Sequence, residues 1–158
     1  MILTGSRYEK VKDMFSEIKK CSWKTAFGGQ VKESSKGYFI EPTIIDNPPD
    51  DSRIVTEEPF GPIMPMLKWS DETEVLERAN SGREGLGASV WSKHLERAEK
   101  MARQLSAGSV WVNSHFDVAP NVPFGGHKAS GIGSEWGMTG FKGYTNSRSL
   151  WVWKKVFE

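Results

Sequence analysis

Cysteine is nearly absent from this chain of 158 residues, which contains only Cys21. No disulfide can therefore form within the chain, as is typical of proteins in a reducing compartment. Long apolar runs are also lacking, since none reaches the roughly 18 residues of a membrane-spanning helix. Arg7 and Glu9 soon interrupt the N-terminal residues, so we expect no signal peptide. Together these absences predict a soluble, cytoplasmic protein without a membrane partner.

An excess of charge of one sign is missing as well, because 21 basic residues stand against 20 acidic ones. Nucleic-acid binders carry a basic surplus or stripe, so no nucleic-acid partner is expected. Metal ligands are sparse: His115 and Asp117 lie two residues apart, but no third ligand follows at a suitable spacing. No metal ion is therefore predicted. The 7 tryptophans, by contrast, are many, and several are expected to fill a core or an interface.

The apolar residues predict helices and strands in alternation. Ser6 and Glu9 have the spacing of a capping box, and a helical stripe follows as far as about Lys20. That stripe consists of Val11, Met14, Phe15 and Ile18. Strands are predicted at 63–69, 86–91 and 109–113, with helices at 71–80 and 95–105 between them. This order predicts βαβ crossovers and a parallel sheet, and Ser147–Trp153 reads as one more strand, apolar on both faces.

A glycine-rich segment without periodicity, residues 114–140, follows the last of the three central strands. Such long segments are usually functional, and ligands of open α/β sheets bind beyond the carboxyl ends of the strands. Within it, Gly131–Gly137 only superficially resembles a dinucleotide fingerprint, because the spacing is off by one residue and no helix opens there after a core strand. Pro123–Lys128 has paired glycines, which allow close approach of the backbone or simply form a tight turn.

Two carboxylates precede an aromatic residue and a rigid turn in Glu57–Pro62. One carboxylate has the chemistry to accept hydrogen bonds from a ribose diol, while Phe60 packs on a flat ring. The same pattern also fits a turn whose phenylalanine anchors in the core and whose acids are solvated. Cys21 follows two lysines at a predicted helix end, where a nucleophilic thiolate is not favoured, so we interpret it as structural.

Four motifs in order resemble those of a single family. They are Gly37–Thr43, Glu57–Pro62, Gly108–Asn113 and Pro123–Gly131. From about Tyr8 to Lys154 the chain is similar to the C-terminal third of the NAD(P)-dependent aldehyde dehydrogenases, most of all to fungal members. The resemblance implies an α/β fold with a parallel βαβ sheet, part of that family's catalytic domain, at residues 1–146. It also implies a C-terminal oligomerisation strand and tail at 147–158.

The resemblance implies roles for matching positions. Glu58 matches the glutamate that holds the nicotinamide ribose, and Phe60 matches the aromatic residue beside the nicotinamide. The positions that match the lining of the aldehyde tunnel are Phe116, Val118 and Phe124. Ser147–Trp153 matches a segment that reaches a neighbouring subunit, so a homo-oligomer is expected through it and through exposed apolar faces.

The family's cysteine nucleophile, glutamate base and oxyanion asparagine lie upstream of where this chain begins, as does most of the cofactor domain. We therefore expect a truncated aldehyde dehydrogenase-like protein, or a half that complements its other half. The parent activity is NAD(P)-dependent oxidation of an aldehyde to an acid. This chain alone is expected neither to perform it nor to bind NAD(P) tightly. The short lead before the first helix favours a natural short gene or a deliberately designed chain.

Two alternatives stay open. One is a stand-alone homologue that isomerises, cyclises or eliminates a hydrophobic small molecule, without redox chemistry. No catalytic residue is assigned for it, and the candidates are His115, Asp117, His127 and Glu58. The other is a non-enzymatic partner that docks on a full-length dehydrogenase through the last strand.

Overall fold

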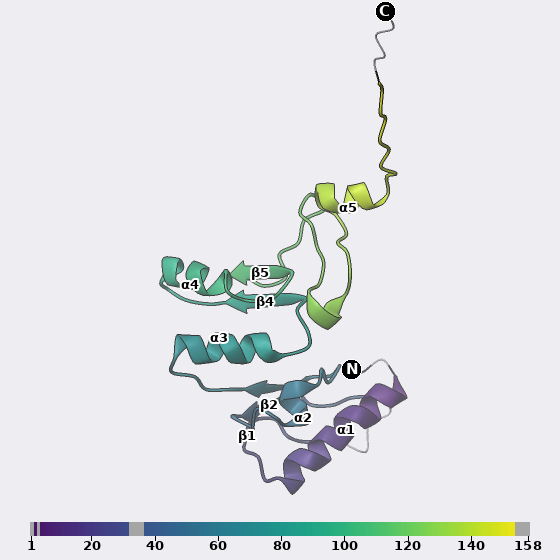
Figure 1. Ribbon diagram of the computed structural model, residues 1–158. Helices are drawn as coiled ribbons and strands as arrows, with labels where there is room; N and C mark the ends of the chain where they lie inside the picture. Colours follow the sequence, from purple (N-terminus) through teal and green to yellow (C-terminus); the bar gives the residue numbers. More distant parts are fainter. Residues whose placement is uncertain (1, 3, 32–36, 154–158) are drawn as a thin grey trace, which may run out of the picture. The chain divides into compact units, whose positions relative to one another are not determined.

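The computed structural model describes residues 2, 4–31 and 37–153, and the chain divides into two compact units, Met1–Ser70 and Asp71–Glu158. Each unit is described by itself. The elements of the first unit are α1 (Gly5–Lys20), β1 (Thr25–Phe27), β2 (Thr43–Asp46), α2 (Arg53–Thr56) and β3 (Ile63–Met66) (Figure 1). Those of the second are α3 (Glu72–Ser81), β4 (Gly87–Val90), α4 (Leu95–Ala102), β5 (Ser109–Val112), the 3₁₀ helix η1 (Lys128–Ser130) and α5 (Gly137–Gly143).

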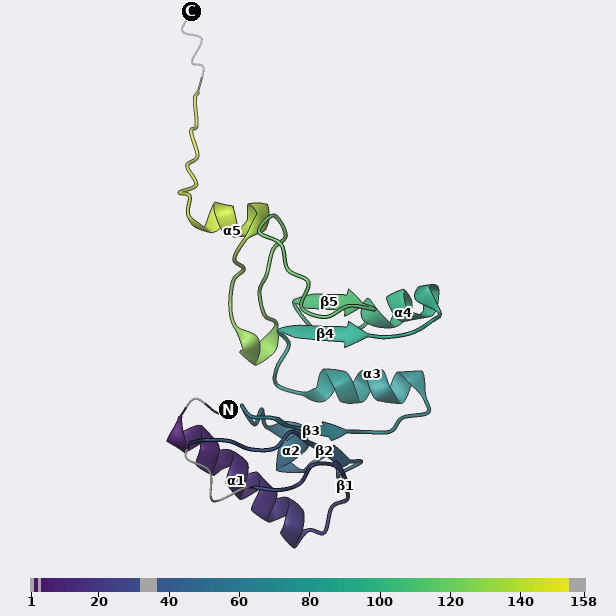
Figure 2. The same cartoon turned by 180° about the vertical axis from the view of Figure 1, so that it is seen from behind.

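The core of the first unit lies between α1 and one face of a three-stranded sheet. The strand order is β1-β2-β3, with β1 antiparallel and β3 parallel to β2 (Figure 2). The predicted stripe of α1 is buried as expected, and it meets Ile45 of β2 and Ile63 of β3. Burial of each such side chain stabilises the fold by about 1.5–3 kcal/mol. Four apolar residues at helical spacing are thus enough to fix how α1 lies on the sheet.

The start of α1 differs from the predicted capping box. The helix begins at Gly5, and Thr4 is its N-cap, with its side-chain oxygen 3.4 Å from the backbone nitrogen of Arg7. Ser6 is already helical, so its hydroxyl cannot serve as the cap. The predicted end at Lys20 is confirmed, and Cys21 follows as the C-cap.

The second unit is built around two parallel strands joined by a helix. β4 and β5 pair from Gly87↔Ser109 to Val90↔Val112, and α4 connects them. The small side chains of Ala98 and Ala102 are the buried positions of α4. The α/β fold with parallel pairing is therefore confirmed. Hydrogen bonding nevertheless divides the predicted central strands between two sheets, because β3 pairs with β2 and β4 pairs with β5.

The chain after α5 is extended, and residues 146–153 have no strand assigned within the described part of the chain (Figure 1). Leu150, Trp151, Val152 and Trp153 are all exposed, at 77% or more. The predicted boundary between residues 146 and 147, and the oligomerising role of the last strand, stay predictions. Residues 154–158 of the predicted tail lie outside the described residues. A search of the described helices found none with the length and apolarity to cross a bilayer.

Candidate functional site

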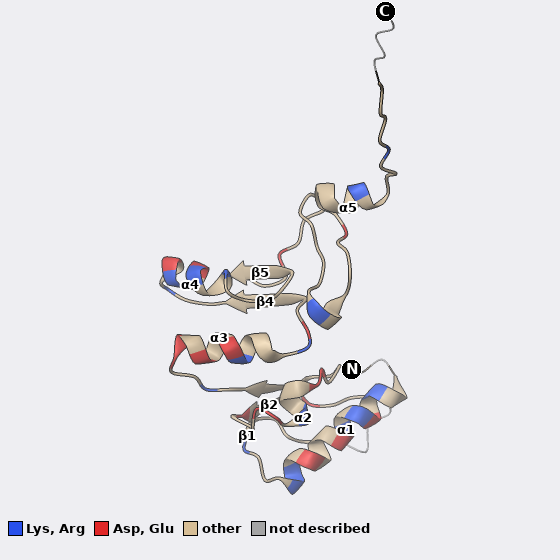
Figure 3. Ribbon diagram, viewed as in Figure 1, with Lys and Arg blue, Asp and Glu red and all other residues tan. Residues whose placement is uncertain are grey.

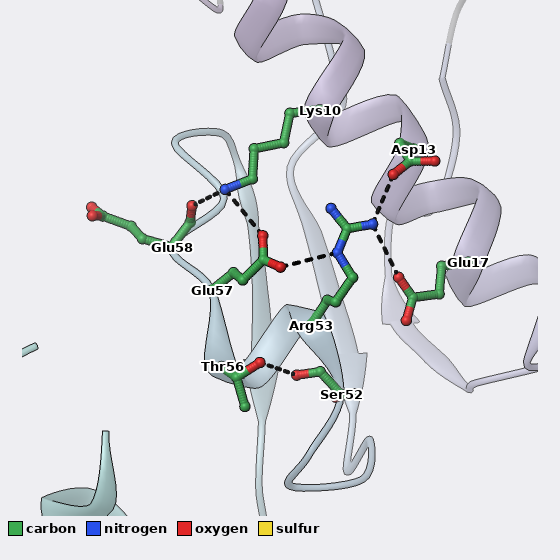
Figure 4. Close-up of polar contacts among 8 residues, drawn as sticks. All are labelled: Lys10, Asp13, Glu17, Ser52, Arg53, Thr56, Glu57 and Glu58. Carbon is green, nitrogen blue, oxygen red and sulfur yellow. Dashed lines mark hydrogen bonds and ion pairs between the residues drawn. The ribbon is translucent and has the colours of Figure 1, made fainter. Parts of the chain in front are cut away.

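The loop that contains Glu57 to Gly61 leaves α2 and enters β3, and a charge network holds its first residue (Figure 4). Arg53 lies at the centre of this network. Its Nη1 is 2.7 Å from Asp13 Oδ2 and 3.5 Å from Glu17 Oε2, and its Nε donates to Glu57 Oε1 at 3.2 Å. Asp13 and Glu17 are four residues apart on α1, so both present their carboxylates on the same side. Arg53 therefore ties α2 and the start of the loop to α1.

Lys10 of α1 completes the network. Its Nζ is 3.3 Å from Glu57 Oε2 and donates to the backbone carbonyl of Glu58 at 3.0 Å. Both oxygens of Glu57 are thus engaged. Hydrogen bonds from Arg53, then from Lys10, hold the pKa of Glu57 below its usual range. The hydrogen bonds of Arg53 with Asp13 and Glu57 in turn raise the pKa of its guanidinium above the ordinary value. Glu57 is consequently a structural carboxylate.

Glu58 has the opposite surroundings. Figure 4 shows its carboxylate pointing away from the network that holds Glu57. Among the described residues it forms no hydrogen bond or ion pair, and it is exposed. The backbone of Glu58 is fixed by Lys10, whereas its two oxygens remain available to a ligand. The structure therefore distinguishes two adjacent acids that the sequence left equivalent.

Phe60 is not anchored in the core, which excludes the simplest structural interpretation of this motif. Its ring is 50% exposed, and its φ of +52° is unusual for a bulky residue. The guanidinium carbon of Arg7 lies 4.3 Å from the ring centroid. Next in the chain, a Cβ on Gly61 would come within 2.7 Å of Val11 Cγ2, so the loop can approach α1 only with glycine there.

These features fit the ribose end of a nucleotide cofactor. A carboxylate without partners accepts hydrogen bonds from a diol, and an exposed ring with a backbone held at positive φ offers a flat apolar contact. Strained backbone of this kind occurs at ligand sites because the surrounding contacts enforce it. An open apolar pocket of about 410 Å³ also borders the loop; it is lined by Phe27, Pro42, Thr43, Ile44, Gly61, Pro62, Ile63 and Met64.

In the second unit, Asn113 fixes the point where the chain leaves β5. Its side-chain oxygen accepts from the Ser92 nitrogen at 2.8 Å, and its side-chain nitrogen donates to the Ser92 carbonyl at 2.9 Å. This pair of bonds joins the segments that follow β4 and β5. The predicted site residues 115–118 begin immediately beyond it, at the carboxyl ends of parallel strands, as expected.

An aromatic cluster occupies this segment. Its members are Trp111, His115, Phe116, Phe124 and Trp136, in successive ring contacts of 5.6 to 6.3 Å between centroids. Phe116 and Phe124 meet edge to face at 6.2 Å, so the structure brings two of the three predicted tunnel residues together. Val118, the third, is exposed in the same segment. Trp111 and Trp136 were not predicted as site residues; the high tryptophan content indicated only that several would fill a core or an interface.

His115 is held by a residue that the sequence did not single out. Its Nδ1 is 2.7 Å from Ser89 Oγ of β4, with the donor set by the imidazole tautomer. Asp117 contributes its backbone carbonyl, which accepts from Trp111 Nε1 at 2.8 Å. No hydrogen bond joins the His115 and Asp117 side chains in the described part of the chain. The described residues likewise contain no cluster of three metal-ligating side chains.

Beyond Phe124, the motif Pro123–Gly131 supports the fold through backbone and lysine contacts, and His127 belongs to this part. The Gly85 carbonyl accepts from the nitrogens of Gly108 and His127 at 2.9 and 2.8 Å. Lys128 Nζ donates to two carbonyls at the end of α3, those of Asn80 and Gly82, which stabilises that helix end. His127 contributes its backbone to this arrangement, and its side chain is not part of the aromatic cluster.

Cys21 lies at the C-terminal end of α1 and is exposed. Its backbone nitrogen donates to the Glu17 carbonyl at 2.8 Å. The carbonyl end of a helix disfavours a thiolate. This placement supports the structural interpretation of the cysteine.

Comparisons with known proteins find similar sequences and structures over most of the chain. The family model described as Aldehyde dehydrogenase family matches residues 2–150. An aldehyde dehydrogenase of Fusarium sp is 36% identical over 94% of this chain and 32% of its own length. The phenylacetaldehyde dehydrogenase of Pseudomonas fluorescens is 44% identical over 78% of this chain and 25% of its own. A solved NAD+ complex of an aldehyde dehydrogenase from Bacillus cereus is 38% identical, with a TM-score of 0.86 over 94% of this chain and 30% of that protein. The chain thus spans about a quarter to a third of the length of these relatives.

Proposed function

The chain belongs to the aldehyde dehydrogenase family, and from this premise we propose that each of its two units contributes residues to NAD(P)-dependent oxidation of an aldehyde. The loop around Glu58 and Phe60 binds the nicotinamide ribose of the cofactor. The aromatic cluster after β5 forms one wall of the aldehyde pocket. The chain does not oxidise an aldehyde by itself.

The contrast between Glu57 and Glu58 carries this proposal. A network of Lys10 and Arg53 engages Glu57 completely and fixes the backbone of Glu58, while the Glu58 carboxylate keeps its acceptor capacity. Holding the Lys10 side chain against the backbone of Glu58 costs conformational entropy. Ligand binding explains such a fixed backbone beneath an exposed carboxylate better than stability does. Several solved relatives are complexes with NAD+, which supports a nicotinamide cofactor as the ligand.

The residues present fit the ribose and the nicotinamide ring, and bound NAD(P) would supply the hydride acceptor. Glu58 would hold the ribose hydroxyls, and Phe60 would limit the position of the ring by packing. Oxidation of an aldehyde also needs a thiolate nucleophile. The sequence offers only Cys21, which is at the wrong end of a helix for thiolate chemistry. The nucleophile must therefore come from polypeptide other than this sequence.

The aromatic cluster supports an apolar, and in particular an aromatic, aldehyde as the substrate. Phe116 is 61% exposed, yet it contacts Phe124 edge to face, so an apolar molecule would gain contact area on rings that already touch. The name of the Pseudomonas relative, a phenylacetaldehyde dehydrogenase, agrees with this substrate class.

The test measures catalysis and binding separately on the purified chain. NADH absorbance with a panel of aldehydes is expected to show no turnover above buffer. Saturation-transfer NMR with nicotinamide riboside is expected to show weak binding that Glu58→Gln reduces about tenfold or more, while Glu57→Gln serves as the adjacent control. Turnover that disappears in Cys21→Ser would instead identify Cys21 as the nucleophile. Turnover that survives that change would require catalytic residues outside those named here.

One observation favours a second candidate function, a non-redox reaction with His115 as general base. Ser89 Oγ lies 2.7 Å from Nδ1 of the imidazole, and Nε2 has no partner among the described residues. In the tautomer whose Nδ1–H donates to Ser89, Nε2 is a proton acceptor beside an apolar ring cluster. Deuterium exchange at the carbon next to the carbonyl of phenylacetaldehyde, followed by NMR in D₂O, tests this candidate. Exchange faster than buffer that is lost in His115→Gln would favour it, and exchange at the buffer rate would exclude it for this substrate class.

A further inference from the structure

Arg7 is a cation that the described structure leaves without an acidic partner. Its guanidinium stacks on the Phe60 ring, with 4.3 Å between the guanidinium carbon and the ring centroid. Within the described residues it has no ion pair, and its side chain makes no hydrogen bond. This contact with the ring uses no hydrogen bond, so the N–H donors of the guanidinium remain unused within the described residues. A cation beside an exposed ring with its donors unused is suited to receive an anion.

The neighbouring cations differ from Arg7 in this respect. Basic and acidic residues are interspersed along α1 (Figure 3), and several of those near the loop form ion pairs. Lys10 pairs with Glu57, and Arg53 pairs with Asp13, Glu17 and Glu57. Lys12, one turn further along α1, pairs with Glu9. Within the described residues, Arg7 therefore keeps an uncompensated positive charge beside the same loop that presents the Glu58 carboxylate without a partner.

We propose that Arg7 binds the 5′-phosphate of the nucleotide whose ribose Glu58 holds. This inference rests on the proposed function of the loop. A mononucleotide carries a diol, a flat ring and a phosphate. The loop and α1 together offer a group suited to each of the three: an acceptor on Glu58, the ring of Phe60 and the N–H donors of Arg7. Arginine suits this task because its planar fork bonds two phosphate oxygens at once, and stacking on a ring sets its orientation beforehand.

If the role of Arg7 were purely structural, its contact with the Phe60 ring would be sufficient. Arg7 would then fasten α1 to the loop through Phe60, and removing its charge would change stability without distinguishing between ligands. A phosphate-binding role makes a different demand. Affinity must depend on the presence of a phosphate in the ligand, and that dependence must disappear with the guanidinium.

The experiment compares nicotinamide riboside with its 5′-phosphate by saturation-transfer NMR on the purified chain. Arg7→Met removes the charge and keeps much of the apolar stem. Lys12→Met is the matched control, since Lys12 is a cation of the same helix that also lies over an aromatic ring, that of Tyr8 at 5.4 Å. Circular dichroism of each variant verifies that α1 is intact.

The wild-type chain is expected to bind the phosphate ester about tenfold more tightly than the riboside, the effect of one charge-assisted contact. Arg7→Met should abolish that difference between the two ligands, while Lys12→Met should preserve it. Added salt should weaken the binding of the phosphate ester and not that of the riboside.

Equal affinity of the wild type for both ligands, with Glu58→Gln lowering both affinities, overturns the role of Arg7 and leaves the proposed ribose site in place. Absence of binding by either ligand overturns the proposed function of the loop, and the role of Arg7 with it.

Discussion

At the scale of single residues, Glu57 and Glu58 are adjacent in the sequence but have opposite electrostatic surroundings. Hydrogen bonds from Arg53 and Lys10 lower the pKa of Glu57 from its ordinary value of 4.5. A carboxyl whose pKa is lower in the folded state stabilises the fold above its unfolded pKa. That contribution is lost as the pH falls through the folded value. Glu57 should therefore stabilise the chain at neutral pH and contribute nothing in strong acid.

We predict that Glu57→Gln lowers the free energy of unfolding at pH 7, and that the difference from wild type shrinks as the pH falls below about 4.5. The expected loss at neutral pH is small, because the ion pairs are solvent-exposed. Urea unfolding of both proteins across the acid range measures the difference directly.

Glu58→Gln is the control for this prediction, since its carboxylate has no partner in the described part of the chain. It should unfold like the wild type at every pH. A penalty for Glu57→Gln that stays constant into strong acid would show that packing, rather than charge, explains the effect.

The residue pattern alone could not have distinguished these two acids. Glu57 pairs with Arg53, four residues earlier, and with the distant Lys10, and only the fold brings α1 to this loop. The exposure of Phe60 was equally hidden, because an aromatic residue in a turn fits a core as well as a ligand site. Glu58 and Phe60 as cofactor residues came from resemblance, and that assignment stays a prediction.

At the scale of elements, the spacing of apolar residues indicated where the helices and strands lie, but it said less about which strands pair. The helices near 71–80 and 95–105 and the strands near 86–91 and 109–113 lie where the apolar spacing placed them. The pairing of β3 with β2 was not foreseen, because strand partners depend on contacts between segments rather than on spacing within one. The start of α1 was missed by two residues because Thr4 and Ser6 are both good caps by type.

The motif Pro123–Gly131 shows how an element can depend on one glycine. A Cβ added to Gly108 would collide with the Gly125 carbonyl oxygen, which is backbone and cannot move aside cheaply. The Gly85 carbonyl, which precedes β4, accepts from the backbone nitrogens of Gly108 and His127 and so joins the same two segments. The backbone segments at Gly108 and Gly125 can thus approach each other only because Gly108 has no side chain.

We predict that Gly108→Ala destabilises the second unit by about 1–3 kcal/mol or more through this overlap. Gly82→Ala is the matched control in the same unit, because a Cβ there has no atom within 4 Å and the φ of −63° suits alanine. Its effect should stay within about 0.5 kcal/mol. Denaturant unfolding followed by tryptophan fluorescence measures both variants. Equal stability of the two would show that the Gly108–Gly125 contact is not maintained in solution.

At the scale of the whole molecule, the two units differ in how much apolar surface they bury. In the described residues, the first unit has a cluster of buried side chains between α1 and its sheet. In the described part of the second unit, the buried apolar side chains are those of Leu76, Ala98 and Ala102. Many large apolar side chains of both units are exposed instead. A surface of this kind is unusual for a monomeric protein and is typical of one that another polypeptide covers.

The exposed segment 150–153 offers the sharpest test of that idea. Its four side chains, two of them tryptophans, are apolar on both faces of an extended backbone, and an unpaired extended segment of this type pairs readily with another chain.

We predict a homo-oligomer in which this segment is covered. Size-exclusion chromatography with light scattering should show a species larger than the monomer. Trp151→Ser combined with Trp153→Ser should shift it towards monomer, because about 150–250 Å² of buried surface is lost for each tryptophan. Trp91→Ser, which removes a tryptophan that is 66% exposed in β4's neighbouring loop, is the control and should leave the assembly intact. A monodisperse wild-type monomer would contradict the prediction, and an oligomer that survives loss of both tail tryptophans would place the contact on the other exposed apolar faces.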